Sequence, residues 1–293
     1  MNGLALARDY YLSYRDTLLA PFPECHERVA AGLVGFGSDC FGYDDVVSRD
    51  HDFGPGFCLW LTEEDQAGFG PALQARYAGL PVAHAGFDTR RISTRAGKRV
   101  GVFSIDEFYC QFLGAPQLPI SDADWLQIPE ELLATAVNGE VFEDPLGRFS
   151  QIRAGLLAYY PASVKRIKLG TAIAKMAQSG QYNLPRALQR NALPVAHMAL
   201  AEFMRHACEA AHVLSNRYAP FYKWLHRSVR DLPALPQLYA QIERLCDMPI
   251  HVAPAVAEEI CADVLRELVR QGYTRHGDVF LEAHVDDILN HAG

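Results

Sequence analysis

Two aspartates at positions 50 and 52 have the type and spacing of residues that hold a metal ion. They precede an apolar run, Phe57 to Leu61, that is typical of a buried strand, and we expect that strand to open with the two acids. Alternation along a strand would point Asp50 and Asp52 to the same face. Neighbouring carboxylates repel each other unless a cation compensates them. A hard divalent ion with oxygen ligands, Mg2+ (or Mn2+), meets that need.

A Gly-Ser pair at positions 37 and 38 follows another apolar run, Val29 to Phe36, and predicts a strand that ends in a tight turn. Glycine lets the backbone approach a phosphate closely, and the turn N–H groups with the Ser38 hydroxyl can donate to phosphate oxygens. The alternative is an ordinary turn beside an exposed acidic strand start. The apolar run at 57–61 opposes that alternative, because its burial would carry the acids to the rim of a core.

The combination resembles a known family. Gly-Ser, eleven residues and then Asp-x-Asp is similar to the signature of the DNA polymerase β-like nucleotidyltransferase superfamily. The stretch Ser48-Arg49-Asp50-His51-Asp52-Phe53-Gly54-Pro55 resembles, more narrowly, an uncharacterised bacterial branch, domain of unknown function 4037. The resemblance continues through Tyr159-Tyr160-Pro161 and the segment from Tyr218 to Trp224.

The resemblance implies a Mg-dependent enzyme that moves a nucleoside monophosphate from a nucleoside triphosphate to an acceptor hydroxyl. Asp50 and Asp52 would be the metal ligands, and Gly37 and Ser38 would hold the triphosphate. A third carboxylate usually acts as the base in such enzymes, and here Asp88 is one candidate. Asp106 and Glu107 are others, although Ser104-Ile105-Asp106-Glu107 also fits a helix capping box.

Basic residues offer further contacts to the phosphates. Arg49 directly precedes the acids and reaches either a phosphate or a neighbouring aspartate. Lys223, inside the family-like segment, is either a contact to the β- or γ-phosphate or a surface lysine. The most basic stretch contains Arg90, Arg91, Arg95, Lys98 and Arg99, and it either attracts an anionic substrate or forms a solvated hairpin.

Composition limits the partners. The 293 residues are 49% hydrophobic and 21% charged, with a formal net charge of −8, as in an ordinary globular protein. That charge disfavours nucleic acid as a partner, and no stretch is long and apolar enough to predict a membrane partner. Seven scattered cysteines without a C-x-x-C pair indicate neither disulfides nor zinc. We therefore expect a cytoplasmic protein.

The predicted fold class is α+β, a small mixed-sheet domain at residues 1–150 followed by an all-helical bundle at 151–293 that closes over the nucleotide cleft. In the first domain, periodicity predicts helices at 4–19, 63–77, 105–113 and 121–133, with the second weakened by Gly68 and Gly70-Pro71. Strand-like pieces at 82–87 and 98–103 predict a hairpin. In the second, the predicted helices are 152–157, 162–179, 184–191, 194–216, 224–231, 236–246, 255–271 and 277–290.

Alternative functions are open at this stage. The acceptor is a small molecule, a protein side chain or an RNA end, and the acidic composition favours the small molecule. A catalytically degenerate protein that binds and senses nucleotides is the main rival, because the third carboxylate is unclear. The spacings Arg190 to His197 and Arg205 to His212 also resemble those of helical toxin ribonucleases.

Overall fold

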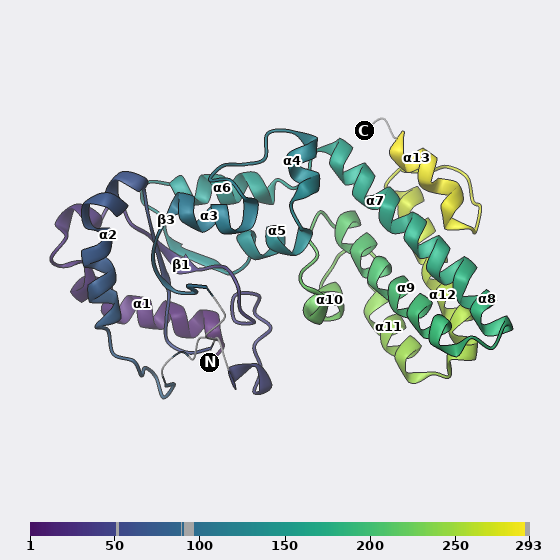
Figure 1. The fold of residues 1–293 in the computed structure, drawn as a ribbon, viewed down its shortest axis with the longest axis horizontal. Helices are drawn as coiled ribbons and strands as arrows, with labels where there is room; N and C mark the ends of the chain where they lie inside the picture. Colours follow the sequence, from purple (N-terminus) through teal and green to yellow (C-terminus); the bar gives the residue numbers. More distant parts are fainter. Residues whose placement is uncertain (51–52, 89, 91–96, 291–293) are drawn as a thin grey trace. The chain divides into compact units, whose positions relative to one another are not determined.

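The computed structural model describes residues 1–50, 53–88, 90 and 97–290. The chain forms two compact units, Met1–Ala158 and Tyr159–Gly293 (Figure 1). The first combines helices with a four-stranded sheet, and the second is helical, so the fold class is α+β as predicted. Among the described helices, none has both the length and the apolar character needed to cross a bilayer.

The sheet of the first unit is mixed. Its strand order is β3-β2-β1-β4, with β1 at Ala30–Leu33, β2 at Cys58–Leu61, β3 at Gly101–Ser104 and β4 at Glu140–Glu143. β1 runs antiparallel to both β2 and β4, whereas β2 and β3 are parallel. The end of β1 and the starts of the other three strands therefore meet at one edge, which we call the upper edge.

Helices cover both faces of the sheet. α1 (Gly3–Leu19) and α2 (Glu63–Ala78) pack on the face that carries Leu59 and Leu61. The opposite face carries Trp60, whose ring stacks on Phe149 of α6 (Arg148–Leu157) with centroids 3.8 Å apart. α3 (Ile105–Leu113) packs on that same face through Phe108. Double coverage explains why every residue of β1, β2 and β3 is buried.

Local capping defines several helix ends. α3 begins after Ser104, whose hydroxyl accepts from the Glu107 N–H, and ends at Gly114 in the left-handed region, so its predicted bounds are confirmed. α2 continues through Pro71, contrary to the predicted weakening, because Pro71 lies on the exposed face, where water can reach the carbonyl of the preceding turn. The predicted helix at 121–133 is instead α4 (Asp122–Gln127) and α5 (Glu130–Val137), separated by Ile128-Pro129.

The second unit packs its helices around α9 (Leu193–Leu214). α7 (Ala162–Met176) lies along α9 and continues as a π-helical segment, Ala177–Asn183, into the next helix. The remaining elements are α8 (Leu184–Gln189), α10 (Tyr222–Val229), α11 (Leu238–Asp247), a 3-10 turn at Ile250–Val252, α12 (Ala253–Arg270), a 3-10 turn at Leu281–His284 and α13 (Val285–Leu289). The predicted helix at 277–290 was therefore too long at its start.

The predicted strand at 82–87 was wrong. His84 and Phe87 exchange backbone hydrogen bonds of 2.9 Å across Ala85 and Gly86, which both have positive φ. This is an isolated turn, since most of the segment is exposed and pairs with no strand among the described residues. The expected hairpin with residues 98–103 therefore does not form, and β3 pairs with β2 instead.

Candidate functional site at the upper sheet edge

The Gly-Ser turn follows the end of β1 after three residues, 34–36, at the upper edge. Gly37 has φ of +134°, a conformation that side chains with a Cβ rarely adopt. Two bonds close the turn: Asp39 O accepts from Gly42 N at 3.0 Å, and Ser38 O accepts from Tyr43 N at 2.8 Å. The predicted strand and tight turn are thus confirmed.

A buried ion pair holds this turn in place. Arg90 Nη2 lies 2.6 Å from Asp39 Oδ2, and the two side chains are 4% and 0% exposed. The second oxygen, Asp39 Oδ1, accepts from the Cys40 N–H at 2.9 Å. Burial alone would lower the pKa of Arg90, but the charge of Asp39 raises it, so the guanidinium stays charged. Both carboxylate oxygens of Asp39 therefore have partners inside the protein.

The same guanidinium reaches the segment that follows the acidic motif. Arg90 Nη2 also donates to Gly54 O at 3.2 Å, two residues after Asp52 in the chain. Gly54 has φ of +137°, and a Cβ there would lie 2.8 Å from the Arg90 backbone and 2.9 Å from Asp88 O. Arg90 therefore joins the Gly-Ser turn to the chain beyond the aspartates. We call this arrangement of Asp39, Arg90 and Gly54 the arginine clamp.

Asp50, one of the two predicted metal ligands, is placed differently from the prediction. Asp50 is the last residue of a 3-10 helix, Val47–Asp50, and is not on a strand. Asp45 and Ser48 start that helix, because each side chain accepts the other's backbone N–H, at 2.8 and 2.7 Å. β2 begins only at Cys58, after Gly54-Pro55-Gly56, where proline removes a ladder donor. Asp52 and the side chain of Asp50 lie outside the described residues.

Arginines and aromatic rings surround the turn. The Arg49 guanidinium lies 5.0 Å from the Phe53 ring centre and 5.6 Å from that of Phe87, and it donates to Met1 O at 3.3 Å. Arg99 lies 4.5 Å above the ring of Phe36, which directly precedes Gly37. Arg49 is exposed and Arg99 half-buried. Arg99 therefore adds a positive charge beside the turn, whereas the charge of Arg90 is compensated by Asp39.

The candidates for the third carboxylate lie at different ends of the sheet. Asp88 is exposed, and its carbonyl lies beside Gly54 at the arginine clamp. Asp106 and Glu107 follow the end of β3, and the parallel pairing with β2 puts that end opposite the upper edge. Burial raises the pKa of Asp106, and Glu63 adds to the rise. Asp106 and Glu107 open α3 at the opposite end of the sheet, so among these three only Asp88 lies beside the arginine clamp.

Two residues singled out from the sequence, Lys223 and His212, lie in the second unit. Lys223 is an exposed residue of α10, with its Nζ 5.4 Å from the Trp224 ring centre. His212 is buried and bonded to Cys208 O at 2.7 Å and Ser228 Oγ at 2.9 Å. Burial lowers the pKa of His212 to about 4, so it stays neutral near pH 7. His212 therefore joins α9 to α10 by a hydrogen bond. This structural role opposes the interpretation of the Arg205-to-His212 spacing as that of a ribonuclease.

The thiols beneath the turn are not nucleophiles. Cys40 and Cys58 are both buried, next to Phe36 O and to Val34 O and Arg99 O respectively. Burial raises the pKa of Cys58 to about 12 and that of Cys40 well above its usual value. Both remain protonated at neutral pH, so any chemistry here depends on oxygen groups.

Sequence reasoning missed two members of this site. Asp39 was passed over because it lies between the Gly-Ser pair and the more prominent aspartates. Arg90 was grouped with a basic stretch that either attracts an anionic substrate or forms a solvated hairpin, and its burial was not foreseen. Their pairing spans 51 positions, and no local pattern announces a contact of that range. The one local signal for the site was Asp39 itself, an aspartate directly after the Gly-Ser pair.

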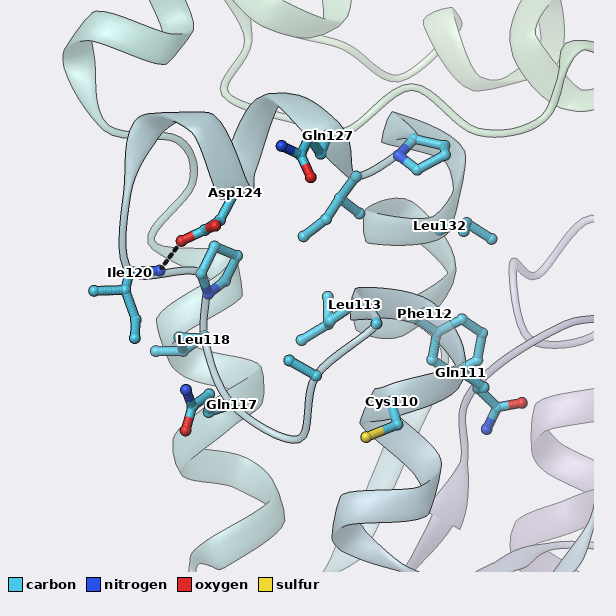
Figure 2. Close-up of a pocket in the computed structure, with 15 residues that line it drawn as sticks. Cys110, Gln111, Phe112, Leu113, Gln117, Leu118, Ile120, Asp124, Gln127 and Leu132 are labelled. Carbon is cyan, nitrogen blue, oxygen red and sulfur yellow. Dashed lines mark hydrogen bonds between the residues drawn. The ribbon is translucent and has the colours of Figure 1, made fainter.

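A cavity of about 660 Å³ lies elsewhere in the first unit (Figure 2). It is formed by the end of α3, the 114–120 loop, α4 and the start of α5, with Cys110, Gln117, Asp124 and Leu132 among its lining residues. In Figure 2 the Asp124 carboxylate turns toward the loop, where it accepts from the Ile120 N–H at 3.2 Å. None of the predicted site residues lines this cavity, so it is separate from the arginine clamp.

Comparisons with known proteins give two similarities. The family described as Domain of unknown function (DUF4037) matches residues 125–225, which confirms that resemblance for this segment. A search of curated proteins returned no match. Among solved structures, the chain is similar to a nucleotidyltransferase-like protein from Exiguobacterium sibiricum 255-15, at 13% identity and a TM-score of 0.36. That similarity covers 92% of this chain and 81% of the other.

Proposed function

We propose that the protein is a nucleotidyltransferase that moves a nucleoside monophosphate from a nucleoside triphosphate to an acceptor hydroxyl. The observation that carries the proposal is the arginine clamp. Arg90 binds Asp39, just after the Gly-Ser turn, and Gly54, just after the Asp-x-Asp motif. The clamp thereby joins the chain just after the Gly-Ser pair to the chain just after the Asp-x-Asp motif.

The donor groups suit a hard divalent cation. Asp50 and Asp52 offer carboxylate oxygens, and exposed Asp88 is near the clamp, whereas Asp39 is already bound to Arg90. We assign Mg2+ to Asp50 and Asp52. Bound there, it would offset negative charge on the phosphate oxygens. The protein groups have distinct roles: the Gly37-Ser38 turn donates to the triphosphate tail, and exposed Arg49 adds a positive charge beside it.

The transfer itself is a substitution at the α-phosphorus. The acceptor oxygen forms a bond to that phosphorus, the bond to the bridging oxygen breaks, and pyrophosphate leaves. Asp88 takes the proton of the acceptor hydroxyl. We favour a small-molecule acceptor, since a net charge of −8 opposes broad binding to RNA.

Pyrophosphate release tests this proposal. The protein is incubated with Mg2+, the four nucleoside triphosphates and a low-molecular-weight cell extract as the source of acceptors. Release that requires Mg2+ and is lost in Asp52→Asn supports the transferase. A thermal shift with triphosphate but no release at any condition would favour the nucleotide-sensing alternative and overturn catalysis.

A further inference from the structure

The C-terminal end of the second unit contains a cluster of residues that the proposed function does not use. It comprises His276, in the loop after α12, His284, at the end of the 3-10 turn Leu281–His284, and Asp287 of α13. One ligand atom from each residue lies within 4.8 Å of the others. The segment is the yellow end of the chain in Figure 1. We propose that this cluster binds a Zn2+ ion.

The contacts of the cluster are short and converge on one hydroxyl. Thr274 Oγ1 lies 2.9 Å from His284 Nδ1 and 2.7 Å from Asp287 Oδ2. His276 Nε2 lies 3.5 Å from the same Asp287 oxygen. Thr274 and His284 are buried, at 2% and 0% exposure, while His276 and Asp287 are nearly half exposed. The cluster is thus anchored on one side and open to solvent on the other.

Counting hydrogens shows that, with a neutral His284 ring, the cluster has one hydrogen for two acceptors. His284 Nε2 lies 2.8 Å from Asp278 O, and a carbonyl only accepts, so Nε2 carries the hydrogen. In the neutral ring, Nδ1 then presents a lone pair. Thr274 has a single hydroxyl hydrogen, but it faces both that lone pair and the Asp287 carboxylate. One of the two acceptors is left facing an oxygen without a hydrogen, which is costly where that acceptor is the buried His284 Nδ1.

A metal ion would satisfy both acceptors at once. Two imidazole nitrogens and one carboxylate oxygen form a three-ligand set that Zn2+ takes, with water in a fourth position. The hydrogen bond from His284 Nε2 to a backbone carbonyl is the usual way in which a protein orients a metal-binding histidine. The rings of His276 and His284 stack at 4.2 Å with an angle of 15° between planes. His276 must therefore turn its half-exposed ring to complete the site.

A bound ion would stabilise the C-terminal segment of the second unit. It would link the loop after α12 to α13, and α13 packs on α7, where Ile288 and Leu289 lie beside Gly170. We therefore expect a structural site that stabilises the C-terminal segment. It lies wholly within the second unit, and its test does not depend on any nucleotide chemistry.

The test is titration of the metal-free full-length protein with Zn2+ and with Co2+. We expect one Zn2+ per chain by calorimetry, visible d–d absorption with Co2+, and a rise in Tm of about 5 °C at a hundredfold excess over Kd. His276→Ala and Asp287→Asn should each reduce affinity at least tenfold. Both positions are exposed, so neither change should prevent folding. His197→Ala, at an exposed histidine of α9, is the matched control and should bind normally.

Two results would overturn the proposal. The first is the absence of Zn2+ and Co2+ binding to the parent protein. The second is binding that survives both His276→Ala and Asp287→Asn, because the ion would then lie elsewhere. Asp52→Asn should leave Zn2+ binding unchanged, which separates this site from the proposed Mg2+ site.

Discussion

Breaking the arginine clamp is expected to destabilise the first unit strongly. Arg90→Ala would leave the Asp39 carboxylate buried at 0% exposure with its main cationic partner removed. Removing one partner of a buried pair typically costs about 3–5 kcal/mol, compared with about 0–1 kcal/mol for an exposed pair. We therefore expect Arg90→Ala to cost about 4 kcal/mol of unfolding free energy.

A matched control separates this effect from the general loss of an ion pair. Arg8 pairs with Glu140, and the two side chains are 42% and 43% exposed. Arg8→Ala should cost only about 1 kcal/mol. In the cycle of Arg90→Ala, Asp39→Ala and the double variant, the double variant should cost clearly less than the sum, because it leaves no unpaired charge.

The assay is urea unfolding followed by tryptophan fluorescence. Trp60 and Trp125 lie in the first unit and Trp224 in the second, so a Trp224→Phe background reports the first unit alone. Triphosphate binding to the folded fraction is measured in parallel. A cost below about 1 kcal/mol for Arg90→Ala, or additive single changes, would refute the reasoning about burial.

Three further outcomes are expected. Gly54→Ala should cost at least about 2 kcal/mol by chemical denaturation, since its φ is +137° and a Cβ would meet the Arg90 backbone at 2.8 Å; a neutral effect would refute the tight approach. His212 has its folded-state pKa lowered by burial to about 4 from 6.5, so the unfolded state binds more protons below pH 6.5, and stability should fall by about 2 kcal/mol between pH 7 and 5. His212→Gln should remove that part of the pH dependence, and an unchanged profile would contradict the assignment. Asp88→Asn should lower pyrophosphate release about 100-fold while Asp106→Asn leaves it intact, and the reverse order would move the base to α3.

The sequence predicted most of the elements, because their signals are local. α3 was predicted to the residue, since Ser104 caps its start and Gly114 ends it in the left-handed region. The strands flanking the Gly-Ser turn were predicted from apolar runs that the structure buries on both faces. At Pro71 the local signal was ambiguous. The helix α2 continues through this proline because the proline is exposed, and exposure depends on the tertiary structure.

The site was harder to predict than the fold. The turn at Gly37-Ser38 could be predicted because its residue types are distinctive. The placement of Asp50 on a strand failed, because Gly54-Pro55-Gly56 delays β2 and the Asp45–Ser48 pair starts a 3-10 helix. The Asp39–Arg90 pair depends on a contact across 51 positions, and a single sequence shows no trace of such a contact. Burial of Arg90 could be learned only from the assembled core.

Nucleotidyl transfer itself is tested most directly by following label from two positions of the same triphosphate. In parallel reactions with Mg2+ and the acceptor extract, we predict that α-labelled triphosphate labels a new product and that γ-label appears in pyrophosphate. Both should disappear in Asp52→Asn. Transfer of the γ-label to an acceptor, release of inorganic phosphate in place of pyrophosphate, or labelling that persists in Asp52→Asn would contradict the account.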